Sequence, residues 1–388
     1  MTVSSGQANW KLEERVRLSE IGRPKATDTF SGLPALLLAA DCELLTVDSR
    51  LSTFNSEPLA MLVLNQQEVE SLLDLDRLVE ALGPAMAELS AGGVAMPPRP
   101  VVRVRDREGL LAAMPVFLGS TQTLATKLVS VFAENPALGL PSHQAVIVVF
   151  DAHTGSPRAL LDGTSITALR TAAGSALATK LLARPEARIL AIVGTGVQAR
   201  AHAKLIPRVR PIKEVRVVGR DRARAAALAD EIVRGQGIPA KAFDVGKEAF
   251  SGADLICVAT HSPEPVVKGE WLDPGVHVNS VGLHPKGREL DGEVVRRALV
   301  VVETRAAALA PPPSGSNDLH WAIRDGLIGE EHIHAEIGQL ISGARPGRTS
   351  SGQITLYKSV GVAVQDAVAA HLVLEAAGHR GVGTDIAL

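Results

Sequence analysis

The chain has few aromatic residues, few cysteines and little net charge. Phe, Trp and Tyr together make up 3% of its 388 residues, and the formal net charge is −2. Nucleic-acid recognition relies on basic surfaces and on bases stacked against aromatic rings, so both scarcities argue against a nucleic-acid partner. The two cysteines, Cys42 and Cys257, are far apart in the sequence. They form neither a disulfide framework nor a zinc cluster, and they suit a reducing cytoplasm, where we expect the protein.

Long apolar runs are also missing. No stretch of about 18 uninterrupted apolar residues occurs, so we expect no transmembrane helix and no membrane partner. Apolar residues nevertheless make up 46% of the chain, and 388 residues suffice for two domains with sizeable cores.

Residues 1–60 differ in composition from the rest of the chain. They mix Ser, Thr, Gly and charged residues with one short apolar run at 33–40, and Glu13, Glu14 and Glu20 argue against a transit peptide. We interpret them as an N-terminal extension without stable order or as the product of a start codon placed too far upstream. A regulatory or interface arm is the alternative.

Residues 61–182 have a mixed pattern. A strand at 61–64 is followed by Asn65, which we expect to cap a helix extending to about residue 89. A long alanine-rich helix is expected at 162–182. Short β-rich runs separated by turn residues predict an antiparallel or mixed sheet, not a nucleotide fold, at 101–104, 109–114, 125–132 and 144–150.

The most informative motif is the glycine-punctuated turn 194–199 (GTGVQA), which follows the apolar run 189–193. The run predicts a buried parallel strand. Gly194 and Gly196 let the backbone turn tightly and approach a pyrophosphate, which the start of the next helix then binds. Ala199 permits close packing of that helix on the strand. A lone glycine turn is weak evidence, but this one begins a long βαβ series.

Strands and helices alternate regularly after the glycine turn. A helix is expected at 222–234, and further strands are expected at 214–219, 240–244, 254–260, 277–282 and 299–303. This alternation predicts an α/β fold with a doubly wound parallel sheet, a Rossmann domain that we place at 183–354. The apolar stretch 355–377 predicts a C-terminal helix, within 355–388, that returns to the first domain.

The end of the second strand of this sheet predicts the cofactor. An acidic residue there hydrogen-bonds the ribose 2′-hydroxyl of NAD, whereas a nearby arginine accommodates the 2′-phosphate of NADP. Gly219 occupies the acidic position, with Arg220 and Arg222 beside it. The pattern favours NADP(H). NAD(H) stays the alternative, because Asp221 can rotate toward the ribose and the two arginines can equally be solvated charges at a helix start.

Three cations lie among apolar neighbours: Arg99, Lys127 and Arg170. Taken singly, each can be a surface charge whose stem covers apolar neighbours. Lysine and arginine are rarely buried without a partner, however. Taken together beside a dinucleotide fold, the three predict a carboxylate substrate and cofactor phosphates as ligands.

Five segments together resemble the ornithine cyclodeaminase/mu-crystallin family. They are 162–164 (DGT), 167–173 (TALRTAA), 194–199 (GTGVQA), 275–282 (GVHVNSVG) and 358–361 (KSVG), and the resemblance runs from about residue 61 to the C-terminus. The family fold implies a substrate-binding and dimerisation domain at 61–182, completed by the C-terminal tail around the Rossmann domain, and hence a homodimer.

The resemblance also implies roles for individual residues. Arg99 and Lys127 would hold the substrate carboxylate, with Lys127 as a proton relay, and Val360 would contact the substrate. Arg170 and Thr171 would contact cofactor phosphates. The remaining predicted cofactor-binding residues are Gly194, Thr195, Gly196, Val197, Gln198, Gly219, Arg220, Arg222, Val258, Ala259, Thr260, Val281 and Ser359.

Two departures from the family pattern narrow the reaction. Cyclising members carry an aspartate shortly after the fourth strand and a glutamate just before a Met-Pro pair. Here 260–262 reads THS, and two alanines precede Met114. Because no carboxylate remains at either position, cyclodeamination of ornithine or lysine is disfavoured, although it stays an alternative.

Other segments, 140–145, 269–271 and 281–291, are similar to the mu-crystallin and ketimine-reductase branch. They imply hydride transfer from NAD(P)H to the C=N carbon of a small 2-imino acid, or a dehydrogenase acting on a 2-imino or 2-oxo acid. The nitrogen must stay protonated to accept hydride, and Lys127 or His261 can supply that proton. His261 can equally be a loop histidine without a role. A non-catalytic binder of NADPH or a small ligand is the third hypothesis.

Two further features predict no chemistry. His332 and His334 have no acidic or cysteine partner at a spacing that fits a metal site, so none is predicted. Cys257 lies inside an apolar strand and is expected to be a core residue.

Overall fold

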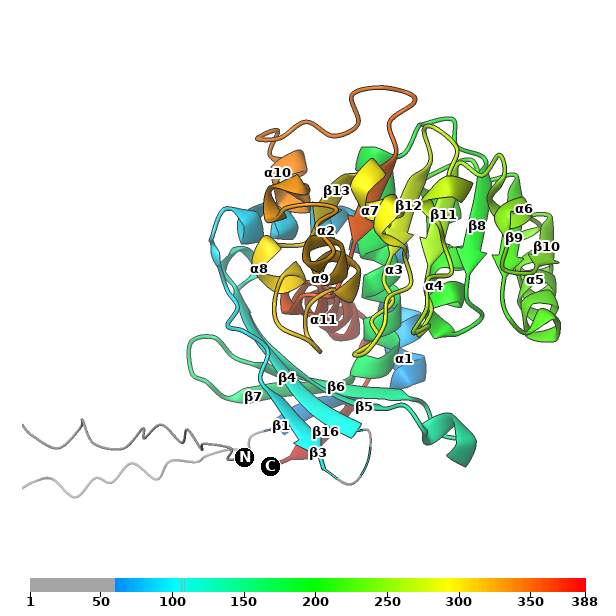
Figure 1. The fold of residues 1–388 in the computed structure, drawn as a ribbon. Coiled ribbons are helices and arrows are strands. Elements are labelled where there is room, and N and C mark those ends of the chain that lie inside the picture. The colour runs from blue at the N-terminus through cyan, green and yellow to red at the C-terminus, as the bar shows by residue number, and fades with distance from the viewer. Residues whose placement is uncertain (1–59, 106, 108) are drawn as a thin grey trace, which may run out of the picture. The chain divides into compact units, whose positions relative to one another are not determined.

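Two β-sheets, with helices between and around them, make up the described part of the chain, which is residues 60–105, 107 and 109–388 of a computed structural model (Figure 1). Of the predicted N-terminal extension only Ala60 is included. The interpretation of that extension therefore lies outside the described residues. Within them, no helix combines the length and the apolar character needed to cross a membrane.

The first sheet, sheet A, is mixed, as the sequence pattern predicts. Its order is β16-β1-β7-β6-β5-β4-β2, with β3 also paired to β4, and only β1 and β7 are parallel neighbours. Its strands are β1 (Ala60–Leu64), β2 (Val94–Ala95), β3 (Val101–Val104), β4 (Gly109–Leu118), β5 (Thr123–Phe132), β6 (His143–Phe150), β7 (Pro157–Asp162) and β16 (Thr384–Ala387). The pattern misses β2, β7 and β16.

The second sheet, sheet B, is parallel throughout, which confirms the doubly wound α/β prediction. Its order is β10-β9-β8-β11-β12-β15-β13-β14. The strands are β8 (Ile189–Val193), β9 (Glu214–Val218), β10 (Ala240–Phe243), β11 (Leu255–Val258), β12 (His277–Ser280), β13 (Leu299–Val302), β14 (Ile333–Glu336) and β15 (Thr355–Lys358).

The C-terminal stretch corrects one prediction. Residues 355–358 do not begin a helix but form β15, which pairs with β12 on one side and β13 on the other. The helix starts only at Ala363, so α11 is Ala363–Arg380. It packs against α2 and α3 and against β4 and β5 of sheet A. The predicted boundaries between domains stay predictions.

The first helical region corrects a second prediction, that of a single helix from Asn65 to about residue 89. Asn65 caps a helix as predicted, but this helix, α1 (Gln66–Leu72), ends at Leu72. Asp74 is the N-cap of a second helix, α2 (Leu75–Ser90). The Asp74 carboxylate accepts hydrogen bonds from the backbone N–H groups of Asp76 and Arg77, which are free at the start of the second helix. The remaining helices are α4 (Val197–Leu205), α5 (Arg222–Gln236), α6 (Lys247–Phe250), α7 (Gly292–Arg297), α8 (Arg305–Ala308), α9 (Asn317–Arg324) and α10 (Ile337–Ile341).

The alanine-rich helix α3 (Gly163–Leu182) connects the two sheets, and its N-cap is Asp162. It contacts β5 and β6 of sheet A, β12 and β15 of sheet B, and helices α2, α4 and α11 (Figure 1). Small side chains suit such a helix, because they let neighbours approach closely on every side. One arginine, Arg170, is buried within it, and this residue leads to the site.

Candidate active site

Lys127 and Arg170 meet at one buried carboxylate, that of Asp366. Lys127 Nζ lies 2.8 Å from the Asp366 carboxylate, and Arg170 donates from Nε to Asp366 Oδ1 over 3.0 Å. The Arg170 guanidinium also donates to Gln365 Oε1 over 2.8 Å. Lys127 is 2% exposed, Arg170 4% and Asp366 2%, so water screens these charges little. The two predicted cations therefore come together, and their partner is a residue that sequence analysis misses.

Three different elements supply this cluster. Inward- and outward-facing residues alternate along β5, and Lys127 lies on the buried face between Ala125 and Val129. Arg170 projects from α3. Asp366 belongs to the first turn of α11, where the partial positive charge of the helix N-terminus favours a carboxylate.

Burial controls the protonation of the cluster. Burial, together with the charge of Arg170, lowers the pKa of Lys127 to about 7, against the attraction of Asp366. Burial alone would raise the pKa of Asp366, but the charges of Arg170 and Lys127 lower it. Lys127 is therefore an amine that can gain or lose a proton near neutral pH, which is what a proton relay requires.

Arg99 reaches the same region from the other side. Its guanidinium is half-buried and donates to the carbonyl oxygens of Val360, at 3.4 Å, and Gly361, at 2.7 Å. Burial and the charge of Arg170 lower the pKa of Arg99. Arg99 and Arg170 thus both lie against the segment that follows β15, which contains the predicted substrate contact Val360, and Lys127 is joined to them through Asp366.

A second buried carboxylate holds that segment. Glu303, at the end of β13, accepts hydrogen bonds from Ser359 Oγ and from the backbone N–H groups of Val360 and Gly361. Gly361 has a φ of +76°, and a Cβ there would lie 2.8 Å from an Arg170 nitrogen. Glycine is therefore needed for both the backbone conformation and the space beside Arg170. Glu303 is another residue missed from the sequence.

His261 lies on a loop after β11, and its Nδ1 is 2.7 Å from the Leu283 carbonyl oxygen. Its ring centroid is 4.6 Å from that of His284. Burial lowers the pKa of His143, and the charges of His261 and Lys127 lower it further.

The glycine turn has the geometry expected of a dinucleotide loop. Gly194 follows β8 with a φ of +119°, and a Cβ there would lie 2.5 Å from the Ala259 carbonyl oxygen. Gly196 is the N-cap residue of α4, with open space where a side chain would lie. The free N–H groups at the start of α4 can bind a phosphate there.

The end of β9 carries the residues predicted to choose the cofactor. Asp221 is engaged as the N-cap of α5, where its Oδ1 accepts from the Arg224 N–H. Arg222 forms an exposed ion pair with Asp244 at 2.8 Å, and Arg220 is exposed. A Cβ on Gly219 would lie 3.2 Å from the Thr195 methyl group, so this strand end adjoins the glycine turn.

The residues predicted for the nicotinamide side lie at the ends of three neighbouring strands. Thr260 follows β11, Val281 follows β12 and Ser359 follows β15. In doubly wound sheets ligands bind at this carboxyl edge.

Arg170 and Thr171 are predicted to contact cofactor phosphates. Arg170 instead contacts Asp366, which also binds Lys127. This contact gives no support to its predicted role at the cofactor phosphates, and that role stays a prediction. Thr171 donates within α3, to the Thr167 carbonyl oxygen.

The histidine pair His332 and His334 is used for structure. Each ring places Nε2 near a backbone carbonyl oxygen, that of Val295 at 2.9 Å and that of Pro346 at 2.8 Å. The prediction for Cys257 is confirmed, because its side chain is fully buried in β11. Burial raises the pKa of its thiol to about 12.

Comparison with known proteins agrees with this geometry. Ketimine reductase mu-crystallin of Mus musculus is 40% identical over 317 residues, which cover 80% of this chain and 96% of that protein. The structure of Thermococcus litoralis Delta(1)-pyrroline-2-carboxylate reductase, in complex with NADH and L-proline, matches with a TM-score of 0.81 and 39% identity, covering 84% of this chain and all of that one. An archaeal alanine dehydrogenase dimer with bound NAD matches with a TM-score of 0.78 and 33% identity, covering 84% and 99% of the two chains.

These matches confirm the family that the sequence motifs indicate and its fold. The profile of the ornithine cyclodeaminase/mu-crystallin family matches residues 60–381, nearly the whole described part of the chain. The protein belongs to the ornithine cyclodeaminase/mu-crystallin family.

Proposed function

We propose that this protein is an NAD(P)H-dependent reductase of a small 2-imino acid and transfers hydride to the C=N carbon. The observation that carries the proposal is the group formed by buried Lys127 and Arg170 and half-buried Arg99, next to the segment that follows β15 and the start of α11. Three cations face the carboxylates of Asp366 and Glu303, which leaves one positive charge uncompensated when all five are ionised. One substrate carboxylate matches that charge.

Each residue then has a defined task. Arg99 and Lys127 hold the substrate carboxylate, which fixes the position of the neighbouring C=N carbon. Lys127, whose pKa is about 7, supplies the proton that keeps the imine nitrogen cationic. His261 is the second candidate for that proton. When bound, a reduced nicotinamide supplies the hydride.

The cofactor is held by the glycine turn 194–198 and by the strand ends that carry Thr260, Val281 and Ser359. We propose NADP(H) over NAD(H) for two reasons. Gly219 stands where NAD-binding folds carry the acidic residue that bonds the ribose 2′-hydroxyl, and the Asp221 carboxylate is already engaged as a helix cap. Arg220 and Arg222 are exposed next to it and can pair with a 2′-phosphate. The similar structures described above contain NADH or NAD, so the preference must be measured on this chain.

We further propose a homodimer formed through the outer face of sheet A. That face exposes apolar side chains: Val102 is 68% exposed and Leu111 46%, and Val146, on the far side of β5, is 40% exposed. Val102 and Leu111 are directly opposite each other on β3 and β4. An exposed apolar face of this kind marks an interaction surface. Size-exclusion chromatography with light scattering on Leu111→Asp tests it, and an unchanged dimer would argue for another interface.

A cofactor-oxidation screen tests the reaction. Cyclic five- and six-membered imino carboxylates and acyclic imino acids are offered with NADPH and NADH in parallel, and loss of the reduced-nicotinamide absorbance is followed. We expect turnover with at least one imino acid. Ammonia release from ornithine or lysine without net cofactor consumption would instead identify a cyclodeaminase. Tight NADPH binding with no turnover across the panel would identify a binding protein.

A further inference from the structure

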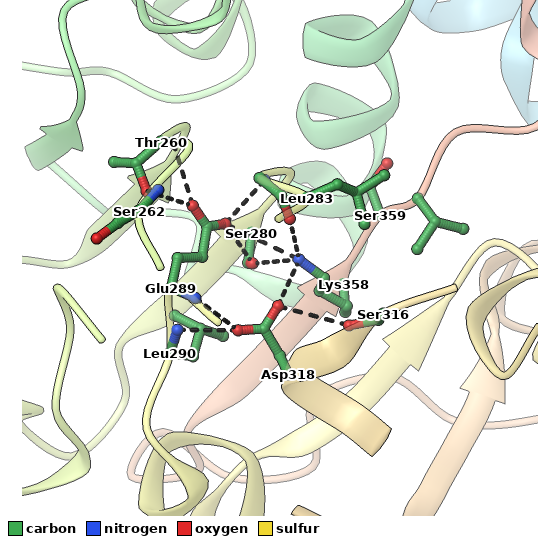
Figure 2. A network of polar contacts seen from close by, with 12 residues as sticks. Thr260, Ser262, Ser280, Leu283, Glu289, Leu290, Ser316, Asp318, Lys358 and Ser359 are labelled. Atoms are coloured by element: carbon green, nitrogen blue, oxygen red, sulfur yellow. Dashed lines mark hydrogen bonds and ion pairs between the residues drawn. The ribbon is translucent and has the colours of Figure 1, made fainter. Parts of the chain in front are cut away.

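A buried carboxylate, Glu289, joins two of the strand ends on which the proposed cofactor site depends. Glu289 is 3% exposed and lies beyond β12 in the sequence. One of its oxygens, Oε2, accepts from the backbone N–H of Thr260 at 3.1 Å and from Thr260 Oγ1 at 2.9 Å. The other, Oε1, accepts from Ser280 Oγ at 2.7 Å and from the Gly282 N–H at 2.8 Å. Figure 2 shows the carboxylate between the loops.

A buried lysine and a second carboxylate extend this arrangement to the third strand end. Lys358, at the end of β15, is fully buried and donates to Ser280 Oγ at 2.9 Å and to the Gly282 carbonyl oxygen at 2.7 Å. Its Nζ also pairs with Asp318 Oδ2 at 2.8 Å. Asp318 in turn accepts from the Glu289 and Leu290 N–H groups, which closes the network (Figure 2).

The network touches or flanks each predicted nicotinamide-side residue. Thr260 is bonded directly, Val281 lies between two bonded residues, and Ser359 follows Lys358. Glu289 and Asp318 also line a crevice together with Thr260 and Gly282. The network therefore lies at the carboxyl edge of sheet B, where a doubly wound sheet binds its ligand.

The donors show which form of Glu289 the fold requires. Four N–H and O–H groups point at its two oxygens, and only the ionised carboxylate accepts at both. Burial raises the pKa of Glu289, and so does the charge of Asp318, whereas Lys358 opposes them. Lys358 thus favours the ionised carboxylate that the four donors fit, whereas burial and the charge of Asp318 favour the protonated form.

We propose that Glu289 is a positioning residue that sets the spacing of the loops after β11 and β12 and thereby orders the nicotinamide side of the cofactor site. This inference rests on the proposed function for its effect on turnover, but the loop spacing itself can be measured without cofactor. The spacing depends on the reach of the side chain as well as on its charge.

Glu289→Gln and Glu289→Asp test the two requirements. The amide of Gln accepts at one oxygen only, so one loop loses its bonds and faces an NH₂ group instead. Asp keeps the charge, but it is one methylene shorter and cannot contact both loops. We expect both variants to lower kcat by about tenfold to a hundredfold, as small misplacements of reacting groups do. We also expect a weaker cofactor dissociation constant in calorimetry and little change in the KM for the imino acid.

Hydrogen exchange of the cofactor-free protein provides a readout that a general loss of stability would not mimic. The amides of Thr260 and Gly282 should exchange at least tenfold faster in both variants, while those within β11 and β12 keep their rates. Glu264→Gln is the matched control, because Glu264 is an exposed glutamate on the same loop as Thr260, and it should behave as wild type.

The inference is overturned by unchanged exchange at Thr260 and Gly282 in Glu289→Gln, or by wild-type exchange and cofactor affinity in Glu289→Asp. Uniformly faster exchange across sheet B would also overturn it, because it would reveal a merely structural role. If the wild-type protein reduces no imino acid, the proposed function fails, but the exchange experiment still decides the role of Glu289.

Discussion

Replacing Asp366 by Asn should move the pH dependence of the enzyme. Asp366 is the partner that keeps the buried amine of Lys127 protonated, and its removal leaves Arg170 as the nearest charge. The Nζ lies 2.8 Å from each oxygen of the Asp366 carboxylate. At an effective dielectric constant near 20, opposite unit charges even about 4 Å apart interact by about 4 kcal/mol, which is about three pKa units.

The pH profile should shift toward lower pH because the proposed active form of Lys127 is the protonated one. In the wild type, activity should fall as the pH rises through about 7, the pKa of Lys127. Without Asp366 this fall should move downward by about one to three pH units. At neutral pH the kcat/KM of Asp366→Asn should then drop by about fivefold or more, with part of the activity regained in more acidic buffer.

The assay is the pH profile of kcat/KM with the best imino acid of the screen. Glu375→Gln is the control on the same helix, since it breaks an exposed pair with Arg77 that should contribute under about 1 kcal/mol. Thermal unfolding of both variants checks that they are folded. An alkaline limb at the wild-type pH in a folded Asp366→Asn protein would refute the link between this carboxylate and the proton relay.

Further predictions follow from other groups. Burial lowers the pKa of His202 to about 4 and that of His277 to about 3, against 6.5 in the unfolded chain. The free energy of unfolding should therefore not depend on these two groups above pH 6.5, and below it should fall by about 1.4 kcal/mol per pH unit for each histidine. Denaturant titrations at several pH values check this, and His202→Gln should reduce the slope. Gly361→Ala should lower kcat/KM at least tenfold by displacing Arg170, and wild-type kinetics would contradict it. Arg222→Ala should raise the KM for NADPH about tenfold and leave that for NADH unchanged; equal effects on both would remove the arginine from cofactor choice.

The regular part of the fold is predictable because local signals there are strong and consistent. The strand before Gly194, the turn itself and α4 are each specified by neighbouring residues, and Asp162 marks the start of α3 by a local cap. The stretch 355–377 is different. It is mostly apolar, so periodicity cannot separate a buried strand from a buried helix. The strand ends at Lys358 and the helix begins at Ala363, and Gly361, with a φ of +76° and no room for a Cβ beside Arg170, lies in the break between them.

The site shows a limit of another kind. Buried cations at Lys127 and Arg170 correctly indicate an unusual electrostatic environment, but their first partner is the protein's own Asp366, more than 190 residues away in the sequence. No local pattern contains that pairing. Polar residues inside an apolar stretch, such as Gln365 and Asp366, are a signal that could have located it. Glu289 and Lys358 give no such signal, because their meeting depends on the order of strands in sheet B.

The position of β15 has a consequence for the making of the protein. Residues 355–358 are a central strand of sheet B, flanked on both sides by strands that precede them in the chain. A ribosome therefore releases β12 and β13 long before the strand that separates them exists. We expect the nascent sheet to stay incomplete until synthesis is almost finished, and a fragment ending at residue 354 to expose two unpaired inner edges and aggregate. Sheet B is thus not expected to fold on its own when the chain is cut at residue 354, where the alternation of strands and helices ends.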